Sequence, residues 1–148
     1  MKRFVGAALA ASVMLSAGTA GAADACYTSS ALEAEQGMRF LVDVMVASTA
    51  CRDQTYGQFQ QRNHETILAY QKALISHFHG NTGYDRWDTA LANGAAMHEA
   101  GKTPPQVCQE AADVLKKAAA MDNAGFRTYA ASLATTALAS GHYKKCGR

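Results

Sequence analysis

Residues 30–51, SALEAEQGMRFLVDVMVASTAC, predict a long amphipathic helix and thereby the fold class of the chain. Ser30 and Glu33 match the capping box, a pattern that satisfies free backbone N–H groups at the start of a helix. After it, apolar side chains recur every three or four residues, which is the spacing of one helix face. That face holds Leu32, Met38, Leu41, Val42 and Met45 and ends near Cys51.

Three further segments show the same helical spacing. They cover about residues 53–78, 84–101 and 104–141, and a Gly-Asn-Thr-Gly loop at 80–83 separates the first two. The last segment begins after residues 103–106, TPPQ, a capping box with proline at the first helical position. No segment alternates apolar and polar residues as a half-buried strand does. The pattern therefore predicts an all-α fold.

The first 22 residues have the pattern of a secretory signal peptide. A positively charged start is followed by an apolar stretch at 4–17, which is too short to span a bilayer, and residues 20–22, AGA, match the rule for cleavage after Ala22. Residues 23–148 then form a single helical domain in the periplasm or outside the cell. Removal of the signal leaves equal numbers of basic and acidic residues. A neutral surface argues against binding to nucleic acid or to an anionic membrane.

Four cysteines in an exported chain predict two disulfides. The first predicted helix is ~33 Å long, so Cys26 before its start cannot reach Cys51 at its end, because a disulfide holds two Cα atoms within ~7 Å. The pairs Cys51–Cys108 and Cys26–Cys146 form if the last segment runs back along the first helix. That path requires a kink, and not a reversal, near 122–125. We therefore expect a disulfide-stapled antiparallel bundle of four to five helices.

A weak likeness to other proteins rests on short motifs between residues 36 and 108. These are residues 45–51 (MVASTAC), Tyr56, Phe59, residues 91–93 (LAN) and Cys108. Together they resemble small exported all-helical proteins of proteobacteria that carry two disulfides and have no known function. The resemblance implies export and disulfide bonding, but it implies no activity and no functional residue.

Three residues are candidates for a metal or haem site. His98 lies on the apolar face of the third segment, and His77 or Met45 could face it across the bundle. His77 and His79 are two apart on an expected helix, so their side chains point apart and cannot share a metal. No HExxH or CxxCH motif is present. Because histidines and methionines at helical spacing are more often packing residues, we expect no cofactor.

Asp43 interrupts the apolar run of residues 40–47, FLVDVMVA, and would need a polar partner if it were buried. Arg39, one turn earlier, and Asn63 and Asn93 from other helices are the candidate partners. A buried pair of asparagines would also fix the register of two helices. Two interpretations remain open. Asp43 is either an acid that works with a histidine of a facing helix, or a structural or solvent-exposed carboxylate.

No motif in the chain indicates catalysis. There is no G-x-S-x-G, no S-x-x-K and no phosphate-binding glycine loop. We therefore expect a non-catalytic protein that binds another protein of the cell envelope as an accessory, inhibitor or immunity protein. The aromatic residues Tyr56, Tyr84 and Trp87 are the candidates for that contact. A haem- or metal-binding periplasmic four-helix bundle is the alternative function.

Overall fold

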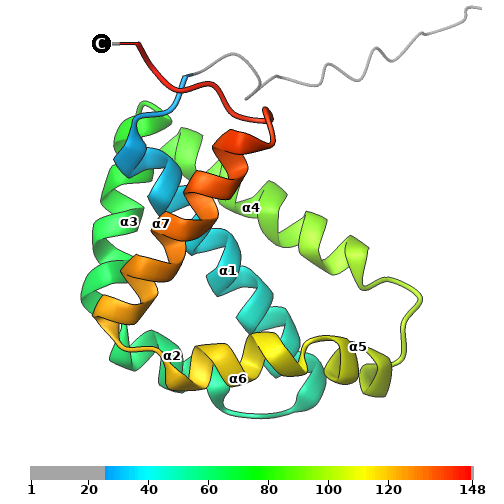
Figure 1. Cartoon of the computed structure of the whole chain (residues 1–148). Coiled ribbons are helices and arrows are strands. Elements are labelled where there is room, and N and C mark those ends of the chain that lie inside the picture. Colours follow the sequence, from blue (N-terminus) through cyan, green and yellow to red (C-terminus); the bar gives the residue numbers. More distant parts are fainter. Residues whose placement is uncertain (1–25, 148) are drawn as a thin grey trace, which may run out of the picture.

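The computed structural model describes residues 26–147, which form seven α-helices and no strand within that range (Figure 1). The helices are α1 (Ser29–Cys51), α2 (Thr55–Arg62), α3 (His64–His77), α4 (Asn81–His98), α5 (Pro104–Glu110), α6 (Ala112–Ala120) and α7 (Asn123–Ala139). The predicted all-α class is confirmed. The number of helices exceeds the expected four to five because two predicted segments are interrupted. The predicted signal peptide, residues 1–22, lies outside the described residues.

α1 is the central helix of the molecule and packs against the other six. α3, α4 and α7 are the other long helices, while α2, α5 and α6 lie together across one end (Figure 1). The sequence predicted that α1 buries one apolar face, but the structure buries residues on most of its circumference. The polar residues Glu35 and Ser48 are among them. The N-cap is Thr28 in place of Ser30, and its Oγ1 accepts a hydrogen bond from the Ala31 backbone N–H at 3.1 Å.

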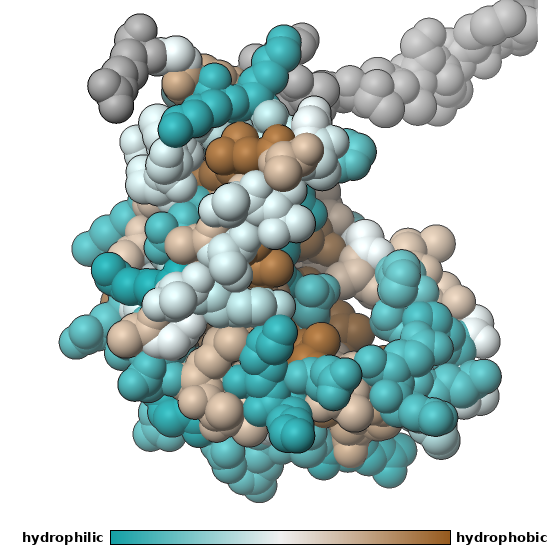
Figure 2. All heavy atoms as spheres, viewed as in Figure 1, coloured by the Kyte–Doolittle hydropathy of each residue, from teal (hydrophilic) through white to brown (hydrophobic). Residues whose placement is uncertain are grey.

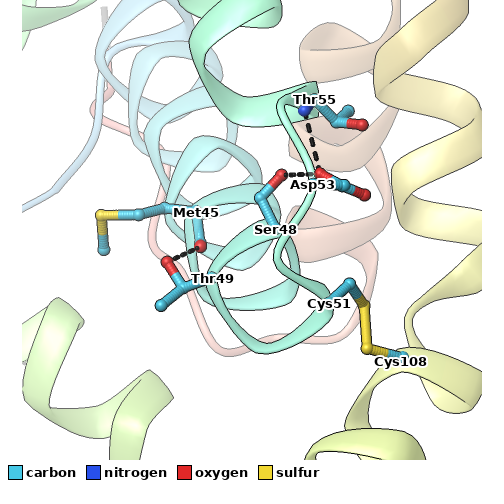
Figure 3. The surroundings of a disulfide bond; sticks show 7 residues. All are labelled: Met45, Ser48, Thr49, Cys51, Asp53, Thr55 and Cys108. Carbon is cyan, nitrogen blue, oxygen red and sulfur yellow. Dashed lines mark hydrogen bonds between the residues drawn. A yellow bond between two sulfur atoms is a disulfide. The ribbon is translucent and has the colours of Figure 1, made fainter.

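The turn after α1 is held by hydrogen bonds and by a disulfide (Figure 3). Ser48 Oγ donates to Asp53 Oδ1 at 2.6 Å, and the Thr55 backbone N–H donates to the same oxygen at 2.9 Å. The hydrogen bond from Ser48 contributes most to lowering the pKa of Asp53. Beside this turn, Cys51 is bonded to Cys108 of α5, with their Cα atoms 5.3 Å apart. The end of α1 is thereby attached to α5.

The second disulfide, Cys26–Cys146, joins the two terminal segments at the opposite end of α1, with the Cα atoms 4.7 Å apart. The Tyr27 backbone N–H donates to the carbonyl of Lys144 at 2.8 Å, and the Cys146 N–H donates to the carbonyl of Tyr27 at 3.0 Å. Both predicted pairings are confirmed. The chain from α5 to α7 does return from the end of α1 to its start, as the pairing requires.

The return path is not one kinked helix, so the predicted kink at 122–125 is wrong in detail. Met121 and Asp122 have extended backbone conformations, and α6 and α7 run in different directions (Figure 1). Arg62, at the end of α2, donates to the carbonyls of Ala118 and Ala119 at 3.1 and 3.0 Å. The last carbonyls of a helix lack an N–H partner one turn further on, and here, of the backbone N–H groups within residues 26–147, only that of Met121 donates to the Ala118 carbonyl, at 3.3 Å. A side chain from another helix therefore stabilises the break.

The predicted helix over 53–78 is also interrupted, at Asn63, and this break too is stabilised by contacts with another part of the chain. Asn63 is fully buried, and its Nδ2 donates to the Phe59 carbonyl at 3.0 Å. One turn into α3, Thr66 Oγ1 donates to Asn123 Oδ1 at 2.8 Å, at the start of α7. The break between α2 and α3 therefore docks against the break between α6 and α7. The loop predicted at 80–83 is also shorter than expected, since α4 begins at Asn81.

The core lies between α1, α2, α3 and α7. The ring of Phe59 packs edge-on against Phe40 and Phe126, with centroid distances of 5.8 and 4.9 Å. Tyr70 lies directly against Gly37, where an added Cβ would come within 2.7 Å of the Tyr70 Cδ2 atom. Polar side chains cover most of the face seen in Figure 2. None of the helices within residues 26–147 is long and apolar enough to cross a membrane.

Candidate functional site

α4 is the most loosely packed of the long helices. None of its 18 residues is buried, whereas α7, with 17 residues, buries Phe126, Ala130 and Ala134. Near the end of α4, Met97 is 72% exposed. Helices in proteins are stabilised mainly by burying an apolar side. α4 therefore retains accessible surface, and two hollows follow one another between α4 and α1.

The first hollow, here called the acidic hollow, lies between α1, the end of α4 and the α5–α6 segment and has a volume of about 310 Å³. Its walls are apolar and consist of Val46, Ala47, Ala95, Val107, Ala111 and Val114. Polar groups also line it, namely Asp43, His98, Glu99 and Glu110. Hydrophobic surface is visible in the recess between α1, α4 and the α5–α6 segment, with hydrophilic side chains around it (Figure 2).

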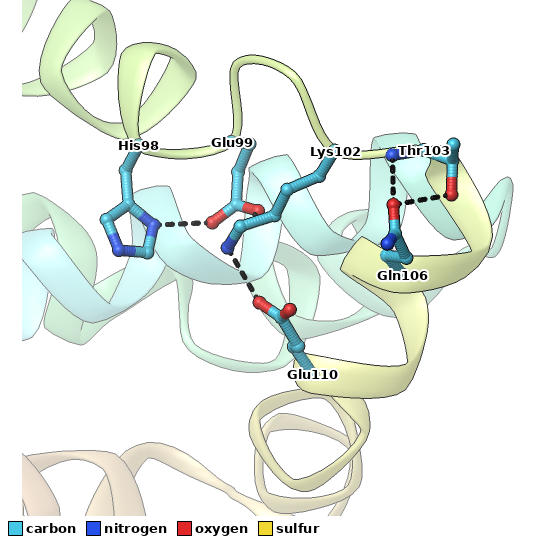
Figure 4. A network of polar contacts seen from close by, with 6 residues as sticks. All are labelled: His98, Glu99, Lys102, Thr103, Gln106 and Glu110. Carbon is cyan, nitrogen blue, oxygen red and sulfur yellow. Dashed lines mark hydrogen bonds and ion pairs between the residues drawn. The ribbon is translucent and has the colours of Figure 1, made fainter.

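A network of charged side chains forms one side of this hollow (Figure 4). Lys102 Nζ lies 3.1 Å from Glu99 Oε2 and 2.6 Å from Glu110 Oε2, and His98 Nδ1 lies 2.7 Å from Glu99 Oε1. The hydrogen bonds from His98 and Lys102 lower the pKa of Glu99. The predicted capping box at 103–106 is present and begins α5 next to this network. The ion pairs of Lys102 with Glu99 and Glu110 thus link the end of α4, the connecting segment and α5.

Asp43 lies in the acidic hollow and is exposed to solvent, which answers the question of its burial. The expected pair with Arg39 does not form. Arg39 Nε and Nη2 instead donate to Glu35 Oε1, at 3.0 and 2.6 Å, one turn in the opposite direction. Asp43 has no hydrogen bond or ion pair to another side chain among residues 26–147. The walls around its carboxyl group keep water away on one side and raise its pKa, and the charges of Arg39 and His98 offset this only in part.

The expected polar link between Asn63 and Asn93 does not form either. Asn63 is fully buried, and besides Phe59 it contacts the Met121 carbonyl at 3.4 Å. Asn93 is exposed on α4. The two residues therefore do not hold α3 and α4 in register, which is consistent with the loose packing of α4.

The second hollow, here called the tyrosine groove, lies between α1, α2, α3 and the first half of α4 and has a volume of about 160 Å³. Two of the three predicted contact residues, Tyr56 and Tyr84, line it together with Met45 and Asp88. Burial raises the pKa of Asp88, and it also raises the pKa values of both tyrosines, to which the charge of Asp88 adds. Trp87 is stacked on Phe78 at the end of α3, with ring centroids 5.4 Å apart. All three aromatic residues are half-buried.

The candidate metal ligands are distributed over separate hollows. Met45 lines the tyrosine groove, His98 lines the acidic hollow, and His77 lies near Cys26 at the start of α1. His79 is outside α3 and has a positive φ of 59°, so the helical argument that separated it from His77 does not apply, and both line the same hollow. In the part of the chain that the structure describes, no three His, Cys, Asp or Glu side chains are placed to hold a metal ion.

A buried polar cluster beside the Cys26–Cys146 disulfide was missed by the sequence analysis. Its centre is Glu35, which is 1% exposed and whose Oε1 accepts a hydrogen bond from the Tyr143 hydroxyl at 3.0 Å, besides those from Arg39. The ring of Tyr27 packs edge-on against Tyr143, and its centroid lies 4.1 Å from the centroid of the His77 ring. Burial, and then the Glu35 carboxylate, raise the pKa values of both tyrosines. This cluster is enclosed and attaches both terminal segments to α1.

Only one part of that cluster had a signal in the sequence. Glu35 and Arg39 are four residues apart, which is the spacing of a helical ion pair. The same spacing separates Arg39 from Asp43, and the sequence does not say which acid Arg39 binds. Tyr27 and Tyr143 come from opposite ends of the domain, so their meeting at Glu35 depends on the tertiary fold.

Comparison with known proteins finds no matching family model, no matching curated protein and no matching solved structure. The resemblance to exported proteobacterial proteins therefore stays a prediction. The function has to be inferred from the geometry of the chain itself.

Proposed function

We propose that this chain is an exported, non-catalytic protein that binds another protein through α4 and the two hollows between α4 and α1. The observation that carries this proposal is that α4 is held near its ends but leaves two hollows between itself and α1. α4 is followed by the Lys102 network and by Cys108, which is bonded to α1, yet none of its residues is buried. A partner that filled both hollows would bury the apolar surface that the fold leaves accessible.

The composition of the two hollows also supports a protein partner. The tyrosine groove presents Tyr56, Tyr84 and Met45, and tyrosine and methionine are enriched in protein–protein interfaces. Apolar surface that is bordered by polar side chains, as in the two hollows, is typical of a contact site. Met97, which precedes His98 in α4 and does not line the hollow itself, is largely exposed and can report on a partner that covers α4.

Two features support the proposed compartment. The fold contains two disulfides, and disulfides persist mainly in oxidising compartments. Together with the signal pattern at residues 1–22, this supports a place in the periplasm or outside the cell. The partner is then a protein of the cell envelope or its surroundings.

A photo-crosslinking experiment in the cells that produce the protein tests this function. A photoreactive phenylalanine analogue placed at Met97 of α4 should give a discrete crosslinked product. The matched control is Leu68 of α3, which is the other exposed large apolar residue within residues 26–147, at 41%. No product at Met97, or equal products at both positions, would contradict a partner-binding role for α4.

A further inference from the structure

The acidic hollow combines features that select one kind of occupant. Its walls are aliphatic and come from three directions, with Val46 from α1, Ala95 from α4 and Val107 from α5. Its volume of about 310 Å³ accommodates a long side chain but not a whole helix. An occupant therefore needs an apolar stem that covers these walls, together with a head group that suits the polar groups around them.

Three of the four polar residues that line the hollow are acidic, and the fourth is His98. Asp43, Glu99 and Glu110 carry carboxylates there, and the cation of Lys102 is shared by the two glutamates. One ammonium group, that of Lys102, thus already lies between two carboxylates that line the hollow (Figure 4). This internal contact shows that the surroundings suit a cationic head group on a flexible aliphatic stem.

Asp43 is the carboxylate that remains available. Arg39 is the nearest cation on its own helix and is directed to Glu35, while His98 of α4 is directed to Glu99. Glu99, the other group that influences Asp43, is itself acidic. Asp43 therefore faces the hollow with no cation bound to it within residues 26–147, in surroundings that are partly shielded from water. An added positive charge would be attracted more strongly there than on an open surface.

We propose that the acidic hollow receives a lysine or arginine side chain of the partner protein, with the aliphatic stem on Val46, Ala95 and Val107 and the cationic head at Asp43. Lysine and arginine are the residues that bury a hydrocarbon stem while they keep a charged head at the edge of a site. The net negative charge of the segment that includes α4 and α5 agrees with a basic occupant. Residues 81–111 carry Asp85, Asp88, Glu99 and Glu110 against Arg86 and Lys102. This inference rests on the proposed function and identifies the chemistry of the partner.

A titration of the purified protein tests the hollow without the partner. The probes are n-butylguanidinium and n-butylammonium, which reproduce the ends of the two side chains, and butyrate is the anionic control. In two-dimensional NMR spectra, the amides of Asp43, Ala95 and Val107 should shift with both cations and not with butyrate. The shifts should be lost in Asp43→Asn and kept in Asp85→Asn, which removes a charge of α4 outside the hollow. Equal shifts in Asp43→Asn would overturn the role of Asp43.

The crosslink at Met97 then tests the partner. Asp43→Asn should reduce the yield of the crosslinked product about tenfold, because one partner of a shielded charge pair is removed, whereas Asp85→Asn should leave it nearly unchanged. Ala95→Leu, which narrows the hollow without changing a charge, should reduce it as well. Equal melting temperatures of the variants show that each is folded.

The two proposals fail in different ways. A full crosslink yield in both Asp43→Asn and Ala95→Leu would leave the docking of a partner on α4 in place and overturn the insertion of a basic side chain. The absence of any crosslink in the unaltered protein would contradict the proposed function. If the cations nevertheless bound at Asp43, the hollow would be a site for a free organic cation, and the assignment to a partner's side chain would be wrong.

Discussion

α7 and α4 have almost the same length and both pack on α1, yet they do so in different ways. α7 turns Ala130 and Ala134 towards the interior, where both are buried. Small side chains let two helix backbones approach closely. In α4, Tyr84 and Asp88 face the tyrosine groove, and both are only half-buried. The comparison teaches that α7 is part of the core, while α4 is held by its ends and keeps its inner side accessible.

The largest expected effect concerns the anchor of α7. Replacement of both Cys26 and Cys146 by serine should lower the free energy of unfolding by about 5 kcal/mol, because this disulfide closes a loop with a sequence separation of 120. The same change at Cys51 and Cys108, with a separation of 57, should cost about 4 kcal/mol. Urea unfolding without reductant measures both values. A clearly larger loss for the second pair would show that α5 depends more on its disulfide than α7 does.

Because α7 is packed more tightly than α4, truncating a large side chain to alanine should destabilise the protein more in α7 than in α4. Phe126→Ala in α7 should destabilise the protein by about 3–5 kcal/mol, because Phe126 is fully buried between Phe59 and Tyr70. Leu91→Ala in α4 should cost less than about 1 kcal/mol, because Leu91 is only partly buried. Thermal unfolding followed by circular dichroism gives both values. Similar losses would mean that α4 belongs to the core as much as α7 does.

The terminal cluster near the end of α7 should respond to alkaline pH. The pKa values of Tyr27 and Tyr143 are raised above the usual 10.0 by burial and by Glu35. The unfolded chain therefore releases these protons first, and the stability should be complete below pH ~10 and decrease above it. Tyr143→Phe should cost about 2 kcal/mol at neutral pH, because Glu35 loses a donor.

Tyr143→Phe should also lose less stability than the unaltered protein when the pH rises above ~10. Absorbance of tyrosinate during alkaline titration, combined with urea unfolding at each pH, checks both expectations. Tyr129→Phe, also on the α7 side of the core, serves as the control. An equal alkaline response in Tyr143→Phe and in the unaltered protein would exclude Tyr143 from the effect.

The smallest expected effect concerns the accessible side of α4. Because the pKa of Asp43 is raised above 3.8 in the folded protein, its ionised form is disfavoured there. This cost is absent at pH values below the ordinary pKa and fully present above the raised one. Asp43→Asn should therefore stabilise the protein at pH 7, by less than about 1 kcal/mol because Asp43 is exposed, and should have no such effect near pH 3. A loss of stability at pH 7 would show that Asp43 has a stabilising partner.

Much of the fold was predictable from local patterns. The capping box at 103–106, the helical spacing and the two disulfide pairs are all present as expected. The length of the first helix excluded the pair Cys26–Cys51, and the expected return of the last segment along that helix selected Cys51–Cys108 and Cys26–Cys146. The candidate site was predictable only in part. Asp43 lines the acidic hollow, but its candidate partner Arg39 is bound to Glu35.

Spacing along the chain was enough to predict that the segments are helical and in which order they follow, and an antiparallel return path was enough to predict which cysteines meet. The tertiary structure alone decided where helices break and which of them is left accessible. Arg62 caps the end of α6, and Thr66 binds Asn123, so both breaks depend on residues more than 50 positions away. Likewise, the exposure of α4 depends on how closely α7 and α3 surround α1. A pattern within α4 cannot encode the space that other helices leave around it.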